Sequence, residues 1–244
     1  MSHSARRILP DAEALAREAA RWLTETARAR FAAGPDAPGH FSIALSGGTT
    51  PRRLYELLAT PEFRDVFPWD RTHLFWGDER LVPSNDPTSN YRMARAALLD
   101  HVPIPPAQVH PVRVMDTPAE TAATYQAELA RFYCSDTLDM ERPLFDVVLL
   151  GLGKDGHTAS LFPGSPALDE SLAWVVPVID AVPQPRVSLT YPAIACSNTV
   201  AFLVSGGNKR DVLQRVLAGD RTLPAARVAA IGEIHWFMDR DAAG

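Results

Sequence analysis

Residues 145–164 read FDVVLLGLGKDGHTASLFPG, an apolar run that stops at glycines and continues into Lys154, Asp155 and His157. The run at 145–150 is typical of a buried parallel strand, and the polar residues then belong to the loop at its carboxyl end. Ligands of open α/β sheets bind at that edge. The stretch therefore predicts a parallel sheet and places a titratable Asp–His pair where chemistry usually occurs.

Helical and strand patterns alternate along the rest of the chain, which predicts an α/β fold with a mainly parallel sheet covered by helices on both faces. No internal repeat or domain boundary is visible, so we expect a single domain over residues 1–244. The segment 34–39 reads as a loop, and the proline-rich segment 103–111 is not expected to be helical. The predicted helices cover 11–33, 51–58, 90–99, 119–132 and 209–217, and the predicted strands cover 41–45, 72–76, 145–150, 174–178, 186–190, 199–204 and 234–238.

Composition argues against a nucleic-acid-binding protein and against a membrane protein. The 244 residues carry a net charge of -5, which argues against nucleic acid as the main partner but leaves room for a local cationic pocket. Cys134 and Cys196 are far apart in sequence and are interpreted as reduced thiols. No signal-peptide pattern opens the chain, and no apolar run approaches the roughly 20 residues that a membrane span needs. We therefore expect no membrane partner and a cytoplasmic protein.

A glycine-rich turn follows the first central strand. Ser46, Gly47, Gly48 and Thr49 connect the strand at 41–45 to a helix, and such a turn can offer backbone amides, hydroxyls and a helix dipole to a phosphate. The turn lacks the GK[ST] of a P-loop. The structural alternative is a tight strand–helix connection with a threonine N-cap.

Two further glycine patterns differ in how strongly they indicate a binding site. Residues 205–210, SGGNKR, repeat the strand-to-helix turn and add Lys209 at its mouth, so they predict a second anion seat or, alternatively, ordinary surface charge. Residues 151–156 match GxGxxG formally, but Pro163 interrupts the long helix that a dinucleotide fold requires. Nucleotide binding is therefore not expected.

His157 suits general acid–base chemistry because its unperturbed pKa lies near neutrality, and Asp155 could orient it. The alternative is that Asp155 caps the turn and His157 packs as a satisfied polar residue. Asp-x-His supplies two metal ligands at best and no further set is present, so no metal is expected. The absence of a GxSxG elbow disfavours a serine hydrolase.

Charged residues also follow the strand at 72–76. Asp78 and Arg80 lie at its carboxyl end, and Arg80 could grip a phosphate or carboxylate through two hydrogen bonds or, alternatively, form an internal salt bridge. Arg186, at the start of a later predicted strand, is another candidate cation. Asn90 and Tyr91 are weaker candidates for the same rim.

Five segments, in this order, resemble the 6-phosphogluconolactonase family, which shares a doubly wound, Rossmann-like fold with the glucosamine-6-phosphate deaminases and isomerases. The segments are LSGGTTP (45–51), WGDERLVP (76–83), SNYRMARAALLD (89–100), GLGKDGHTASLFPG (151–164) and SGGNKRDVL (205–213). The deaminases are the main alternative, but their pattern has a Glu where this chain has Phe162 and a Tyr where it has Arg80. A non-catalytic sugar-phosphate sensor is a third possibility, although such regulators usually carry an added nucleic-acid-binding domain, for which this chain has no spare length.

The resemblance implies hydrolysis of 6-phospho-D-glucono-1,5-lactone to 6-phosphogluconate, without metal or organic cofactor. His157 would be the general base and Asp155 would hold its imidazole. The implied binding residues are Ser46, Gly47, Gly48 and Thr49 for the 6-phosphate, Arg80, Arg186 and Lys209 for the phosphate or the developing oxyanion, and Asp78 for sugar hydroxyls. Nothing in the sequence indicates an oligomeric state.

Overall fold

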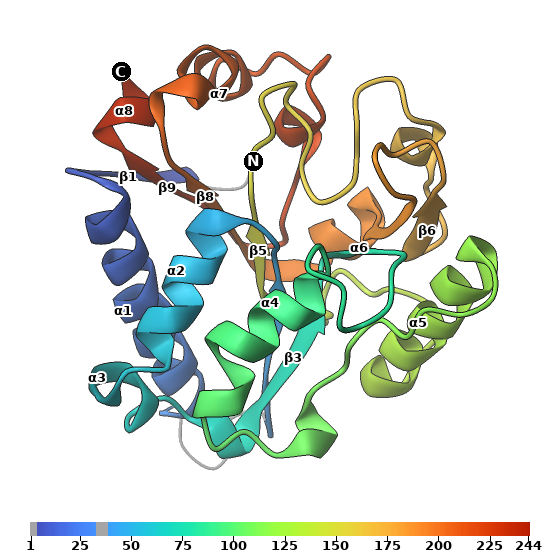
Figure 1. The fold of residues 1–244 in the computed structure, drawn as a ribbon, viewed down its shortest axis with the longest axis horizontal. Helices are drawn as coiled ribbons and strands as arrows, with labels where there is room; N and C mark the ends of the chain where they lie inside the picture. The colour runs from blue at the N-terminus through green and yellow to red at the C-terminus, as the bar shows by residue number, and fades with distance from the viewer. Residues whose placement is uncertain (1–3, 33–38) are drawn as a thin grey trace.

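The computed structural model describes residues 4–32 and 39–244, and a six-stranded sheet runs through their centre (Figure 1). All neighbouring strands in it pair in parallel, which confirms the predicted mainly parallel sheet. In spatial order the strands are β1 (Ser4–Leu9), β9 (Glu233–Asp239), β8 (Ser197–Val204), β5 (Phe145–Leu150), β2 (Phe41–Leu45) and β3 (Thr72–Trp76). The predicted loop at 34–39 falls almost entirely outside the described residues.

The helices lie on both faces of this sheet: in Figure 1, α1 and α2 lie on one side of it and α5 and α6 on the other. Their starts are explained by local sequence. Asp11 caps α1 by accepting from the Ala14 amide at 2.8 Å, and Thr117 and Glu120 form a capping box on α5. The helices are α1 (Ala12–Phe31), α2 (Thr49–Leu58), α3 (Pro61–Arg64), α4 (Asn90–Ala97), α5 (Pro118–Tyr133), α6 (Tyr191–Ala195), α7 (Arg210–Leu217) and α8 (Arg240–Ala243).

Two predicted strands do not join the main sheet. The segments at 174–178 and 186–190 form β6 (Val175–Val178) and β7 (Arg186–Leu189), which pair antiparallel with each other. A short strand that the sequence did not suggest, β4 (Asp78–Arg80), pairs antiparallel with β7 to complete a three-stranded sheet. An isolated apolar run does not encode its pairing partner, so the sequence analysis did not reveal this second sheet.

Two other departures concern the edge strand and the proline-rich segment. The sequence analysis missed β1, because this edge strand alternates exposed and half-buried residues and lacks a continuous apolar run. Within the segment 103–111 a 3-10 turn forms at Pro106–Gln108 and begins at a proline, the one helical position where a missing N–H costs nothing. Two more short turns, Leu99–His101 and Trp69–Arg71, flank α4 and β3.

The core explains why the central strand is apolar apart from Asp146, whose carboxylate accepts from the Ser42 amide at 2.8 Å and pairs with Arg30. Every residue of β5 is buried, and rings from neighbouring strands stack beside it, as Phe202 does on Trp236 at 4.0 Å between centroids. Cys134 and Cys196 form no disulfide, as predicted. None of the described helices combines the length and the apolarity that a bilayer crossing requires. The assignment of the whole chain to one domain stays a prediction.

Candidate active site

The site lies where the winding of the sheet reverses. From β2 the chain passes through α2 to β3, whereas from the adjacent β5 it passes through α6 to β8, which lies on the opposite side. The register pairs Ile43 with Val147 and Ala44 with Val148, so the turns that follow β2 and β5 leave the sheet next to each other. Crevices at such switch points are the usual ligand sites of open α/β sheets.

A cavity of about 210 Å³ opens at this point. It brings together eight of the ten residues that the sequence predicted for the site; Asp155 and Thr49 are the exceptions. The lining residues are Ser46, Gly47, Gly48, Asp78, Arg80, Asn90, Gly151, Leu152, Gly153, His157, Thr158, Ala159, Arg186 and Lys209. Thr49 lines an adjoining cavity of about 260 Å³ that shares Gly47, Gly48 and Lys209 with the first.

His157 and Asp155 form a hydrogen-bonded pair at the end of β5. Nδ1 of His157 lies 2.6 Å from Oδ1 of Asp155, and the same oxygen accepts from the His157 backbone amide at 3.1 Å. Partial burial pushes the pKa of Asp155 upward, but these hydrogen bonds outweigh it and hold the pKa below its ordinary value. An ionised Asp155 keeps the proton on Nδ1, so Nε2 carries the free lone pair. The His157 side chain is 29% exposed and so is open to the cavity.

Gly153 makes room for this pair. A Cβ atom at Gly153 would lie 2.1 Å from Nδ1 of His157 and 2.6 Å from Oδ1 of Asp155. Its amide also donates to the His157 carbonyl at 2.8 Å, which closes the turn. The glycine that resembled part of a nucleotide motif is therefore required by close approach of two side chains. No long helix follows Gly156, in agreement with the sequence analysis.

The turn after β2 is braced from below by a buried tyrosine. The hydroxyl of Tyr55 accepts from the Ser46 amide at 2.9 Å and donates to the Ser46 carbonyl at 2.8 Å. Gly48 has φ 105° and is the N-cap of α2, with no side-chain cap. The alternative of a threonine N-cap is therefore wrong, and the amides at the start of α2 are not bonded by a capping side chain.

Arg80 and Arg186 lie opposite each other because β4 and β7 pair in that register. The Nε atom of each is buried and has no hydrogen-bond partner among the described residues, and neither forms an ion pair with a described carboxylate. Burial lowers the pKa of Arg186; the charge of Asp78 opposes this effect and the charge of Arg80 adds to it. The internal salt bridge considered for Arg80 is therefore not formed. Two adjacent guanidinium groups with unused donors are suited to an anion.

Asp78 is buried beneath these arginines in a hydrogen-bond network. Its Oδ2 accepts from the Ser160 hydroxyl at 2.6 Å, and its Oδ1 accepts from Nδ2 of Asn90 at 3.3 Å. Ser160 also lies 3.5 Å from Nη1 of Arg186. The sequence analysis missed Ser160, and only the pairing of β4 with β7 brings it close to Asp78. Asn90, a weak candidate from sequence, lines the cavity.

Lys209 contributes a third cation from the opposite side, where burial and the nearby Lys154 charge lower its pKa. The rest of its turn is not an open anion seat. The Ser205 hydroxyl and the Gly206 amide both donate to the carboxylate of Asp239, at the end of β9. A protein carboxylate thus occupies the position predicted for a second phosphate, and the prediction is corrected to Lys209 alone.

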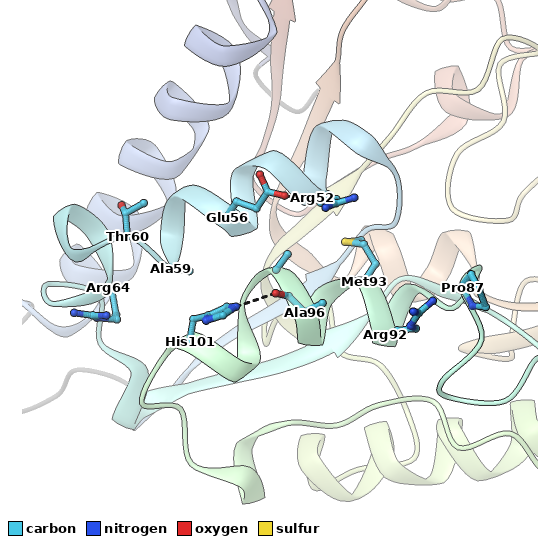
Figure 2. A pocket seen from close by; sticks show the side chains of 11 residues that line it. Arg52, Glu56, Ala59, Thr60, Arg64, Pro87, Arg92, Met93, Ala96 and His101 are labelled. Carbon is cyan, nitrogen blue, oxygen red and sulfur yellow. Dashed lines mark hydrogen bonds and ion pairs between the residues drawn. The ribbon is translucent and has the colours of Figure 1, made fainter.

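A larger cavity, of about 620 Å³, lies elsewhere, between α2 and α4 (Figure 2). Arg52, Arg64 and Arg92 surround it, and Glu56 accepts from Arg52 at 3.0 Å. The histidine of this cavity differs from His157: His101 bonds the Ala96 carbonyl and has no carboxylate partner within residues 4–32 and 39–244. Size therefore does not locate the candidate active site; the convergence of a paired histidine, open amides and unpaired cations does.

Comparison with known proteins identifies the family of the chain. The family model described as "Glucosamine-6-phosphate isomerases/6-phosphogluconolactonase" matches residues 10–236. The chain belongs to this family. A 6-phosphogluconolactonase of Synechocystis is 44% identical over 208 residues, which is 84% of each chain. The 6-phosphogluconolactonase structure from Trypanosoma cruzi has a TM-score of 0.80 at 32% identity and covers 100% of this chain and 97% of that one.

The sequence analysis kept the glucosamine-6-phosphate deaminases as an alternative, and a solved deaminase structure resembles this chain. A monomeric glucosamine-6-phosphate deaminase superimposes with a TM-score of 0.77 over 98% of each chain at 20% identity, which supports the shared fold alone. In this chain Phe162 stands beside the proposed base: its ring centroid is 4.5 Å from that of His157. No carboxylate is supplied from that position.

Proposed function

We propose that the chain hydrolyses 6-phospho-D-glucono-1,5-lactone to 6-phosphogluconate, the reaction that its relatives' names describe. The observation that carries the proposal is the location of a carboxylate-held imidazole in one cavity with the Ser46–Gly48 turn and three cations. The cavity therefore offers one group that can accept a proton and several that can hold an anion.

The 6-phosphate binds at the turn after β2 in this proposal. The amides at the start of α2 point toward an anion bound there, and the positive end of the helix dipole adds to the attraction. The hydroxyls of Ser46 and Thr49 supply further donors. Arg80, Arg186 and Lys209 surround the same volume and serve the phosphate or the developing oxyanion. The buried carboxylate of Asp78 accepts from sugar hydroxyls.

Nε2 of His157 accepts a proton from water as the water oxygen bonds to the lactone carbonyl carbon. The tetrahedral oxyanion then collapses, the bond from this carbon to the ring oxygen breaks, and the imidazolium returns its proton to that oxygen. The product acid loses its own proton to solvent. Asp155 holds the productive tautomer and stabilises the transient imidazolium, as expected for a third group behind a base. No step requires a metal.

Replacing His157 with alanine tests this proposal. Lactone opening is followed in a pH-stat, and the spontaneous rate is subtracted. We expect His157→Ala to lose roughly 10²–10⁴-fold in kcat, the usual contribution of acid–base catalysis. His101→Ala is the matched control, because His101 is exposed and bonds a backbone carbonyl, that of Ala96. Full activity in His157→Ala would reject the base, and loss of wild-type activity in EDTA would reject the metal-free mechanism.

The deaminase and sensor alternatives are separated by two assays on the wild-type protein. A deaminase would release ammonia from glucosamine 6-phosphate, whereas the proposal expects none. A sensor would bind 6-phosphogluconate without turning over the lactone. The cytoplasmic location and the absence of nucleic-acid partners stay predictions.

A further inference from the structure

Phe162 contacts two groups of the site at once. Its ring centroid lies 4.5 Å from the imidazole of His157, with 41° between the ring planes. The guanidinium carbon of Arg186 lies 5.1 Å from the same ring centroid. A single half-buried aromatic side chain therefore stands against both the proposed base and one of the proposed anion-binding cations.

A tight turn at residues 158–161 brings Phe162 back to His157, and several contacts hold this turn in place. Thr158 and Leu161 form an isolated bridge, and the Thr158 hydroxyl donates to the Gly151 carbonyl at 2.8 Å. The Ser160 amide donates to the Ser188 hydroxyl at 3.1 Å, and Leu161 is fully buried. The position of residue 162 is thus set by the backbone, so its ring is a fixed surface for its neighbours.

The Phe162 ring restrains the orientations of the imidazole and the guanidinium, which the hydrogen bonds alone do not fix. One bond to Asp155 fixes Nδ1 of His157 but leaves the imidazole free to swing about that contact. Among the side chains that the structure describes, Arg186 has only the Ser160 hydroxyl, 3.5 Å away, as a hydrogen-bond partner, and its Nε is unpaired there. A flat apolar surface limits the rotation of the imidazole, and cation–π attraction holds the guanidinium.

Phe162 also lines a second cavity, of about 360 Å³, together with residues that include Pro166, Val178 and Val182. The aromatic ring therefore contacts the imidazole of His157 and the guanidinium of Arg186 and also faces this cavity. A smaller side chain at position 162 would leave unfilled space beside both groups.

We propose that Phe162 is a positioning residue that holds the imidazole of His157 and the guanidinium of Arg186 in the orientations required by a bound sugar phosphate. The inference rests on the proposed lactonase function and deepens it. A residue with this role affects both the chemical step and substrate binding, because it acts through the base and through a binding cation. Its loss changes kcat and KM together.

The test compares Phe162→Leu with Phe162→Tyr and with a matched control. Phe31→Leu removes another half-buried ring that contacts an arginine, Arg71 at 3.8 Å, on α1 and outside the active-site cavity. We expect Phe162→Leu to lower kcat on the order of 10–100-fold, as small misplacements of catalytic groups do, and to raise KM. Phe162→Tyr keeps the ring and retains most activity, and Phe31→Leu leaves both constants unchanged.

An imidazole NMR spectrum tests the same inference without relying on turnover. Phe162→Leu is expected to remove the ring-current shift of the His157 carbon-bound protons and to broaden them, whereas Phe31→Leu leaves them in place. If the wild type turns over no lactone, the proposed function fails, and these spectra still decide whether Phe162 positions the imidazole. Phe162→Leu matching Phe31→Leu in kcat, KM and spectrum would overturn the inference.

Discussion

Oδ1 of Asp155 accepts two hydrogen bonds from His157, one from the imidazole at 2.6 Å and one from the backbone amide at 3.1 Å. The two interpretations left open by the sequence, an orienting carboxylate and a turn cap, are therefore both realised by one oxygen atom. This arrangement ties the tautomer of the proposed base to the conformation of its own turn.

Replacing Asp155 with asparagine is expected to lower kcat by roughly 10²–10⁴-fold, because the amide no longer stabilises the protonated ring or fixes the Nδ1–H tautomer. KM should change little, since Asp155 does not line the cavity. Steady-state kinetics on the lactone check this. Asp169→Asn, at an exposed site, is the control, and equal kinetics in the two variants would contradict an orienting role for Asp155.

Replacing Gly153 with alanine is expected to displace the Asp–His pair, because the new Cβ would lie within 2.6 Å of atoms of both side chains. Overpacking of this kind typically costs about 1–3 kcal/mol of stability. The loss of kcat should be larger than this loss of stability alone would cause. Steady-state kinetics measure kcat, and urea denaturation measures the free energy of unfolding. Gly39→Ala meets nothing within 4 Å and serves as the control. A fully active Gly153→Ala protein would show that the pair tolerates displacement.

Replacing Arg186 with glutamine should raise KM by roughly 10–100-fold, since hydrogen bonds to charged groups contribute about 1.5–3 kcal/mol. The unliganded protein should lose little stability, because burial of the Arg186 charge and repulsion from Arg80 oppose its attraction to Asp78, and Arg186 forms no ion pair with a described carboxylate. Thermal melts with and without inorganic phosphate measure both effects, with Arg28→Gln as the exposed control. An undiminished phosphate-induced shift would remove Arg186 from the binding site.

Stability should fall as the pH drops from 7 toward 4, in part because of His73. Burial, followed by the charges of His110 and His40, lowers the pKa of His73 to about 4 from its ordinary 6.5. Between pH 6.5 and about 4 the unfolded chain binds a proton at His73 that the folded chain does not bind. The stability present above pH 6.5 is therefore lost on acidification.

The groups that face His73 shape this dependence. Its Nδ1 lies 2.9 Å from Nε2 of His110, and Nδ1 of His110 lies 2.8 Å from the Glu128 carboxylate. Denaturant unfolding at several pH values should show a flatter profile for His73→Gln than for the wild type. His101→Gln is the exposed control. An unchanged slope in His73→Gln would assign the acid sensitivity to other groups.

Much of the fold and of the site could be predicted from local sequence. The run at 145–150 is apolar on both faces apart from Asp146, and this pattern is typical of a strand buried on both faces. The glycines after β2 and β5 likewise indicated where a ligand can approach the backbone. The failures also have physical reasons. β1 is a half-exposed edge strand with no apolar run. The turn at Ser205 is filled by Asp239, which lies on a later strand.

The sequence by itself determined which side chains end each strand, and hence that Asp155 and His157 follow β5 as Ser46 follows β2. Only the tertiary structure decided that these ends are neighbours and that Arg80 faces Arg186 across a separate antiparallel sheet. Periodicity within a segment reports how that segment is buried. Strand pairing depends on contacts between segments that are far apart in sequence, as Ile43 and Val147 are. The backbone hydrogen-bonding groups of every strand are chemically alike, so packing of the whole chain selects the partner.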